Sequence, residues 1–273
     1  MKKRGFTLAE VLITLGIIGV VAALTAPQLV MSSRNEANAA KLSVVVSNLE
    51  NAFTNAIVSE GAQDLYGTSL WNGPGGAVNA NSSLANRRNF TGQLGRYLTV
   101  TGTSNAANNP TNDYYGGSNI HPMNASGGTN TSVNQNQIAG MGFFPIFMKN
   151  GAVVHIATFA RGNVLTQAQI DNRVAQGVNG LYNFADIAID VNGSAPPNTY
   201  GRDIFYFIVS EKGVLYPAGS ADFSFFEDGV LTNTWDQAGH WLTCNNNAYG
   251  TQEDVMGLGC TARLIHDGYR MNY

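Results

Sequence analysis

The 273-residue sequence predicts an α+β fold, in which a long N-terminal helix packs on an antiparallel β-meander. Three observations support this prediction. They are an apolar N-terminal run, an amphipathic helical pattern directly after it, and alternating segments around an Asn-Gly turn in the second half. A long helix laid on an antiparallel sheet buries the apolar face of both elements, which defines the α+β class.

The first element is an apolar run from Phe6 to Val30 that follows the basic residues Lys2, Lys3 and Arg4. A helix of this length spans about 37 Å, enough to cross the hydrocarbon core of a membrane. Basic residues stay on the cytoplasmic side, so the rest of the chain is expected outside. A cleaved secretory signal is the alternative, with small residues at 22–26 as the cleavage region.

An amphipathic helical pattern continues after Pro27, which predicts one helix of roughly 50 residues. Pro27 is expected to kink this helix rather than end it, and Gly61 is expected to cap its C-terminus. The apolar positions recur at steps of three and four residues: Leu42, Val45, Leu49, Phe53 and Ala56.

One residue of the apolar run needs a physical explanation. Glu10 places a carboxylate near the start of the membrane segment, where a charge at a helix centre costs roughly 2.5–3.5 kcal/mol. Either the side chain reaches the headgroup region, or it meets an opposite charge.

The string GFTLAE at residues 5–10, with the apolar helix and Pro27 behind it, resembles the class III leader of type IV pilins and type II secretion pseudopilins. The resemblance covers about the first 30 residues. It implies that a prepilin peptidase cuts between Gly5 and Phe6 and methylates the new amino group. It also implies that Glu10 of one subunit pairs with the Phe6 amine of its neighbour during assembly, with a platform membrane protein and an assembly ATPase as further partners.

The later part of the chain supplies the predicted sheet. Asn150-Gly151 is a strong hairpin turn between two strands, and the C-terminal 260–273 segment reads as either a strand or a helix. The 99–140 segment is expected to be mostly irregular. The predicted strands and short helices are strands Phe143–Lys149, Ala152–Phe159, Asn183–Asp190, Asp203–Ser210 and Val214–Tyr216, and helices Asn86–Leu98 and Leu165–Gln176.

We expect five regions along the chain. They are a leader (1–5), a transmembrane and polymerisation helix (6–30), the amphipathic half of that helix (31–61), a Gly/Asn-rich variable region (62–140), and the sheet with a C-terminal disulfide region (141–273).

The two cysteines, Cys244 and Cys260, are open to two interpretations. In an exported domain they are expected to form a disulfide that closes a short loop, whereas in the cytosol they would be buried thiols. The outward orientation favours the disulfide, much as many pilins close a C-terminal loop.

A search for catalytic patterns finds no constellation that indicates an enzyme. The four histidines lack zinc-site spacing, and neither a nucleophile elbow nor a phosphate-binding loop occurs. Asp190, Asn192 and Asp203 form a candidate calcium loop, because calcium takes oxygen ligands and Asp-x-Asn-Gly resembles the start of such a loop. The alternative is a turn in which Asp190 and Asn192 bond their own backbone. No other cofactor is expected.

The residues therefore predict a filament subunit of a type IV pilus or type II secretion system. It is expected in the cytoplasmic membrane as a single-pass precursor, and then in an extracellular or periplasmic filament with itself and related pilins. The alternative is a minor pilin-like subunit that acts as an adhesin or substrate-recognition module at a filament tip. A net charge of −3, with only 12% charged residues, argues against nucleic acid as a partner.

Overall fold

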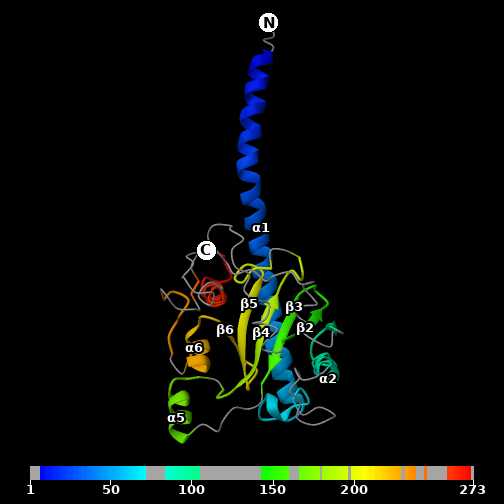
Figure 1. Cartoon of the computed structure of the whole chain (residues 1–273), viewed down its shortest axis with the longest axis vertical. Coiled ribbons are helices and arrows are strands. Elements are labelled where there is room, and N and C mark those ends of the chain that lie inside the picture. The colour runs from blue at the N-terminus through cyan, green and yellow to red at the C-terminus, as the bar shows by residue number, and fades with distance from the viewer. Residues whose placement is uncertain are drawn as a thin grey trace.

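The computed structural model describes residues 7–71, 84–104, 143–159, 166–178, 180–195, 198–228, 231–237, 243–244 and 257–271. A long N-terminal helix, a six-stranded antiparallel sheet and several short helices form the α+β, pilin-like architecture that the sequence predicts (Figure 1). The predicted cleavage position between Gly5 and Phe6 lies outside the described residues, as does much of the 62–140 region.

Helix α1 (Leu8–Ser59) is a single helix of 52 residues that continues through Pro27. Its N-terminal half projects away from the sheet, while its C-terminal half lies along it (Figure 1). The helix ends as expected, because Gly61 follows the C-cap residue Glu60 with a φ of +63°, a conformation that glycine adopts without strain. The predicted single helix of roughly 50 residues is confirmed.

The six strands lie in the sheet in their sequence order, and each is antiparallel to its neighbour. The turn between the second and third strands contains Gly151 with a φ of +78°, as the Asn-Gly pair predicts. The strands are β1 (Val100–Thr103), β2 (Phe144–Met148), β3 (Val153–Thr158), β4 (Asn183–Asp190), β5 (Ile204–Ser210) and β6 (Leu215–Pro217).

Strand β1 was not among the five strands that the sequence predicts, and it lies at the start of the 99–140 segment that was expected to be mostly irregular. Its pairing with β2 is interrupted by a register shift between Val100 and Gly102. The Thr101 and Thr103 hydroxyls donate hydrogen bonds to the carbonyls of Phe147 and Pro145. These contacts are made across the sheet, so the local Gly/Asn/Ser composition does not reveal them.

The short helices lie around this sheet. The predicted helix at Asn86–Leu98 begins and ends earlier than expected, and the C-terminal segment is a helix rather than a strand. The sequence reading also missed the helix that follows β6. The short helices are η1 (Leu65–Gly67), α2 (Leu84–Leu94), α5 (Gln167–Ala175), α6 (Ala221–Asp228) and α7 (Cys260–His266).

Two apolar clusters cover opposite faces of the sheet. On the face against α1, Phe205 and Phe207 of β5 pack in one cluster with the fully buried Phe53. The alternate residues Tyr206 and Ile208 belong to the second cluster, together with Phe223 of α6. Because successive side chains of a strand point to opposite faces, burial of both faces explains why β5 reads as a continuous apolar run.

The turn between β5 and β6 rests directly on α1. Gly213 has a φ of +81°, and a Cβ atom placed there would lie 2.8 Å from the Phe53 Cβ. We expect Gly213→Ala to lower the free energy of unfolding by about 2 kcal/mol or more, through backbone strain and this contact. Chemical denaturation measures the change. Gly61→Ala is the matched control, because Gly61 has a φ of +63° and nothing within 4 Å of its added Cβ. Equal losses of stability in the two variants would contradict a destabilising contact between the added Cβ and Phe53.

Candidate functional site

The N-terminal half of α1 carries its apolar side chains on the outside. From Leu8 to Met31 the large apolar residues are between 43% and 80% exposed, although the same helix buries one apolar face from Ala39 to Ala56. Among the described residues, α1 is long and apolar enough to cross a membrane. An exposed apolar surface of this extent indicates an interaction with lipid or with other protein helices.

The first turn of α1 holds the Glu10 carboxylate in a capping box. The Thr7 amide and hydroxyl donate to Glu10 Oε2 at 2.8 and 2.9 Å, and the Glu10 amide donates to Thr7 Oγ1 at 3.3 Å. Such reciprocal bonds satisfy amides that a helix N-terminus leaves without a partner. Sequence reasoning treated Glu10 only as a charge and missed this role. The Thr-x-x-Glu spacing is the signal that could have predicted it.

Further along the exposed half, hydroxyl groups bond to the helix backbone. Thr14 Oγ1 donates to the Glu10 carbonyl at 3.0 Å, and Thr25 Oγ1 donates to the Val21 carbonyl at 2.9 Å. Polar groups that bond to their own helix can enter hydrocarbon at low cost. Pro27 lies inside α1 and has no amide hydrogen to donate, so a kink at this residue stays a prediction.

The candidate calcium residues meet in the loop between β4 and β5. The carboxylates of Asp190 and Asp203 are fully buried, and Asn192 contacts both: its amide donates to Asp190 Oδ1 at 3.1 Å, and its Nδ2 donates to Asp203 Oδ2 at 3.1 Å. The amides of Asn198 and Thr199 also donate to Asp203, at 2.9 and 2.5 Å. Burial raises the pKa of Asp203, and these N–H donors oppose that rise.

This geometry includes the predicted turn, because Asp190 accepts the backbone amide two residues on. The described residues contain no group of three or more His, Cys, Asp or Glu side chains that could hold a metal ion. One feature still fits calcium: Asn192 Oδ1 is buried without a hydrogen-bond partner. Rotation of the Asn192 amide would turn this oxygen toward Asp203 and produce an oxygen cluster.

Calcium binding therefore stays a prediction, and thermal melting tests it. If the loop binds calcium, the full chain in detergent should gain roughly 2.7 kcal/mol of stability when calcium is about 100 times its Kd. Asp203→Asn should abolish the calcium-dependent rise in melting temperature, while magnesium should produce none. Identical melting in calcium and in chelator would contradict the prediction.

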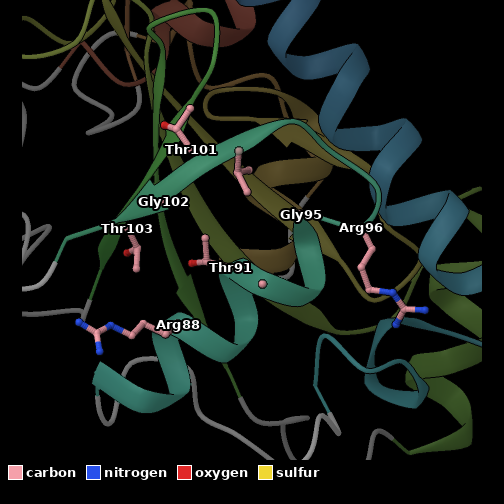
Figure 2. A pocket seen from close by; sticks show the side chains of 9 residues that line it. Arg88, Thr91, Gly95, Arg96, Thr101, Gly102 and Thr103 are labelled. Atoms are coloured by element: carbon pink, nitrogen blue, oxygen red, sulfur yellow. The ribbon is translucent and has the colours of Figure 1, made fainter.

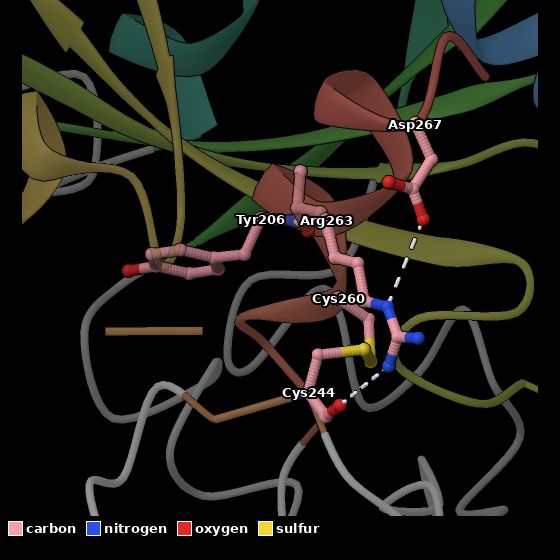
Figure 3. Close-up of a disulfide and its surroundings, with 6 residues drawn as sticks. Tyr206, Cys244, Cys260, Arg263 and Asp267 are labelled. Carbon is pink, nitrogen blue, oxygen red and sulfur yellow. Dashed lines mark hydrogen bonds and ion pairs between the residues drawn. A yellow bond between two sulfur atoms is a disulfide. The ribbon is translucent and has the colours of Figure 1, made fainter. Parts of the chain in front are cut away.

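At the C-terminal end, Cys244 and Cys260 form the predicted disulfide, with a Cα–Cα distance of 4.5 Å. Arg263 lies beside it (Figure 3): its Nη1 donates to the Cys244 carbonyl at 3.2 Å, and its Nε lies 3.7 Å from an Asp267 carboxylate oxygen. Trp235 packs against the two cysteines. The disulfide and Arg263 thus tie the segment at Cys244 to helix α7.

Helix α7 is in turn bonded to the sheet. The Tyr206 amide of β5 donates to Thr261 Oγ1 at 3.0 Å, and the Ala262 amide donates to the Ala218 carbonyl at 3.0 Å. A Cβ atom on Gly201 would lie 2.7 Å from the Cys260 Cβ, so the β4–β5 loop also contacts the disulfide. The C-terminal region is therefore part of the sheet domain.

Two buried titratable side chains of the sheet have shifted pKa values. His155 of β3 is fully buried, and burial lowers its pKa to about 3. Asp186 of β4 accepts hydrogen bonds from Tyr206 Oη at 2.9 Å and Asn183 Nδ2 at 3.0 Å, and burial raises its pKa to about 6. Both side chains are buried in the sheet domain, His155 completely and Asp186 with 5% of its surface exposed.

The Asp186 carboxyl makes a testable contribution to stability. Its pKa in the folded state is about 6, above the ordinary value of 3.8, so the folded protein binds this proton more tightly than the unfolded chain does. The resulting contribution to the free energy of unfolding is complete below about pH 4 and is lost as the pH rises through 6. Asp186→Asn should therefore stabilise the protein at pH 7.5, by about 2–3 kcal/mol at most, and have little effect at pH 4.

The measurement is chemical denaturation of both proteins across this pH range. Asn183 Oδ1 is buried without a hydrogen-bond partner, so a rotated Asn183 amide can accept from the new side chain. His155 lies on the same face of the sheet, and its contribution to the free energy of unfolding falls as the pH drops below 6.5. Because His155 is present in both proteins, this contribution cancels when the two free energies are subtracted. A pH-independent difference would contradict the assignment.

The described helix and sheet define a pilin-like α+β fold with an exposed apolar N-terminal helix. Residues 1–26 match the prokaryotic N-terminal methylation motif. This motif is the class III prepilin leader of type IV pilins and pseudopilins, and its presence supports a pilin-like or pseudopilin-like precursor. No curated protein and no solved structure matches the chain. The motif points to a structural subunit rather than an enzyme, and it suits an inner-membrane-anchored precursor with a filament outside.

Proposed function

We propose that the chain is a structural subunit of a type IV pilus or type II secretion filament, cut after Gly5 and polymerised through α1. The observation that carries this proposal is the division of α1: one continuous helix buries its C-terminal half against the sheet and exposes its apolar N-terminal half. In the precursor, lipid covers this apolar half. In the filament, the same surface packs against the N-terminal helices of neighbouring copies.

In this proposal Glu10 sets the register between subunits. Cleavage creates a positive amine at Phe6, and the capping box holds the Glu10 carboxylate at the start of the helix. Each charge is costly to desolvate alone, so pairing between subunits favours one axial position over others. A prepilin peptidase, a platform membrane protein and an assembly ATPase are the proposed partners.

The test is to shear filaments from intact cells and to quantify the protein in that fraction by mass spectrometry. Abundant protein with an N-methylated Phe6 would support a major pilin. Processed protein found in the membrane alone would support a minor subunit or a secretion pseudopilin. A chain that keeps Met1 after expression with its native peptidase would overturn the proposal.

A further inference from the structure

Asn-Gly pairs occur at four places in the sequence, and the structure describes two of them completely. These are Asn150-Gly151 in the β2–β3 turn and Asn192-Gly193 in the β4–β5 loop. An asparagine followed by glycine can react with its own backbone, because glycine has no side chain to shield the next amide nitrogen. The two pairs have the same local chemistry, so a difference in their reactivity must come from the fold.

The pair at Asn150 lies in an exposed turn between fixed strands. Asn150 and Gly151 are both exposed, whereas β2 and β3 on either side of the turn are almost entirely buried. Strand β1 (Figure 2) pairs with β2 beside the turn, and the Lys149 amide donates to the Thr99 carbonyl at 3.4 Å. The strands therefore hold the hairpin in place, while the turn itself meets water and can open locally.

The Asn150 side chain is folded back over the next amide. Its Oδ1 accepts the Ala152 amide, two residues on, at 3.0 Å. This bond closes a ring that contains the Gly151 nitrogen, so it holds the side-chain carbon Cγ beside that nitrogen. The same N–H points at the oxygen on which negative charge develops when Cγ is attacked, as an oxyanion-hole donor does.

Two further features of the Asn150 turn bear on the reaction. Nδ2 of Asn150 makes no hydrogen bond to the part of the chain that the structure describes, so the leaving group is not held. The Gly151 amide donates to the Met148 carbonyl at 3.0 Å, and this one bond must break before the nitrogen can attack. The reaction therefore requires a local opening of the turn rather than unfolding of the sheet.

The surroundings of Asn150 are positively charged. A Cβ atom placed on Gly151 would lie 3.8 Å from Lys41 Nζ, and Lys149 directly precedes the asparagine. Lys41 also interacts with the buried Asp190, which offsets part of its charge. Because attack on Cγ creates negative charge, the two lysines favour the reaction.

Asn192 has the opposite surroundings. Its Nδ2 donates to the Ala195 carbonyl at 3.0 Å and to Asp203 Oδ2 at 3.1 Å, so its leaving group is held by two bonds. Its Oδ1 is buried without a hydrogen-bond partner, so no N–H would stabilise a developing oxyanion. The neighbouring Asp203 carboxylate further opposes negative charge at this site.

We propose that Asn150 is a site of spontaneous modification, at which the chain converts this asparagine into aspartate and isoaspartate. The Gly151 nitrogen attacks Asn150 Cγ, a new N–Cγ bond forms and the Cγ–Nδ2 bond breaks. Nδ2 leaves as ammonia, with the proton that the Gly151 amide loses. Water then opens the cyclic imide: hydrolysis at Cγ gives aspartate, and hydrolysis at the main-chain carbonyl gives isoaspartate.

The two products differ in their effect on the hairpin. Aspartate keeps the backbone and adds one negative charge to a chain whose net charge is −3. Isoaspartate routes the main chain through Cγ, which lengthens the turn by a methylene group. Because the turn fixes the register in which Phe147 lies opposite Val153, isoaspartate should weaken the β2–β3 pairing next to it.

The test stores the full chain in detergent at pH 7.5 and follows each asparagine over time by peptide mass spectrometry. An isoaspartyl methyltransferase detects the isoaspartate product. In the folded chain we expect Asn150 to convert at least about tenfold faster than Asn192. In guanidinium chloride the two sites should convert at similar rates, because unfolding removes the surroundings that distinguish the two Asn-Gly pairs.

Three variants examine the site. Asn150→Gln keeps an amide but would have to form a larger ring, so it should abolish conversion at this position. Lys41→Met should slow the conversion of Asn150 by about two- to fivefold, the range expected for a charge near the protein surface. Lys212→Met removes an exposed lysine from the β5–β6 turn and should leave the rate unchanged. Circular dichroism melting verifies that each variant is folded.

Equal conversion of Asn150 and Asn192 in the folded chain would overturn the proposal. So would an Asn150 that stays intact in the folded chain while both sites convert in guanidinium chloride, because the turn would then protect the side chain. An unchanged rate in Lys41→Met would contradict the role given to that lysine. The reaction needs neither a membrane nor a second subunit, so its failure leaves the proposed filament role untouched.

Discussion

Replacing Glu10 with glutamine should leave the precursor processed and inserted in the membrane, but should lower its yield in sheared filaments at least about tenfold. Glutamine keeps the capping box, because its side-chain carbonyl can still accept from Thr7. The substitution therefore removes the charge alone. The Phe6 amine of a neighbouring subunit would then be buried without a partner, which typically costs about 3–5 kcal/mol. Quantitative mass spectrometry of sheared and membrane fractions measures the loss.

Two controls separate the charge of Glu10 from other effects. Glu36→Gln removes the same charge from the same helix at an exposed position beyond the apolar half, and it should assemble nearly normally. Thr7→Val removes the capping hydroxyl and keeps the Glu10 carboxylate. Any loss of filament yield in this variant therefore measures the contribution of the helix cap rather than that of the charge. Normal filament yield from Glu10→Gln would show that the charge has no role in assembly.

Replacing both cysteines with serine should destabilise the sheet domain by about 3 kcal/mol. Cys244 and Cys260 are 16 residues apart, and closing a loop of about this length restricts the unfolded chain by that amount in the entropy model. For a domain of this size the corresponding fall in melting temperature is roughly 6–12 °C. Guanidinium denaturation of the full chain in detergent, followed by tryptophan fluorescence, measures the change. Trp235 packs on the disulfide and should report its loss directly.

Reduction of the native protein provides the matching control. Dithiothreitol should destabilise the wild-type chain by about as much as the double substitution, and it should not affect the substituted chain. Equal stability of the oxidised and serine proteins would show that Arg263 and the contacts of α7 with β5 hold the C-terminal region without the covalent bond.

Local patterns in the sequence predicted much of the fold. The apolar spacing from Leu42 to Ala56 predicted the buried face of α1, and the Asn150-Gly151 turn predicted the β2–β3 hairpin. These features depend on residues close together in the chain. Strand β1 depends instead on β2, whose paired residues lie more than 40 positions away, so the local pattern around Gly102 gave no sign of it.

The candidate site was predicted less completely. The leader motif identified Glu10 and Pro27, but the Thr7 cap that holds the carboxylate was not predicted, because Glu10 was interpreted through its charge alone and not through the Thr-x-x-Glu spacing. The loop at Asp190 and Asp203 was predicted as a cluster, yet the direction of the Asn192 amide, which decides whether the cluster presents oxygen or N–H groups, depends on tertiary contacts. Sequence spacing cannot specify such an orientation.

The sequential order of the six described strands has a consequence for how the sheet domain folds. Each strand pairs with the one made just before it, and the β2–β3 and β5–β6 connections are short. Pairing between consecutive strands keeps contact order lower than crossover connections would, so the sheet can grow strand by strand against α1. The disulfide joins the segment at Cys244 to helix α7, and both are made after all six described strands. Oxidation should therefore be a late event that locks the domain rather than one that directs its topology.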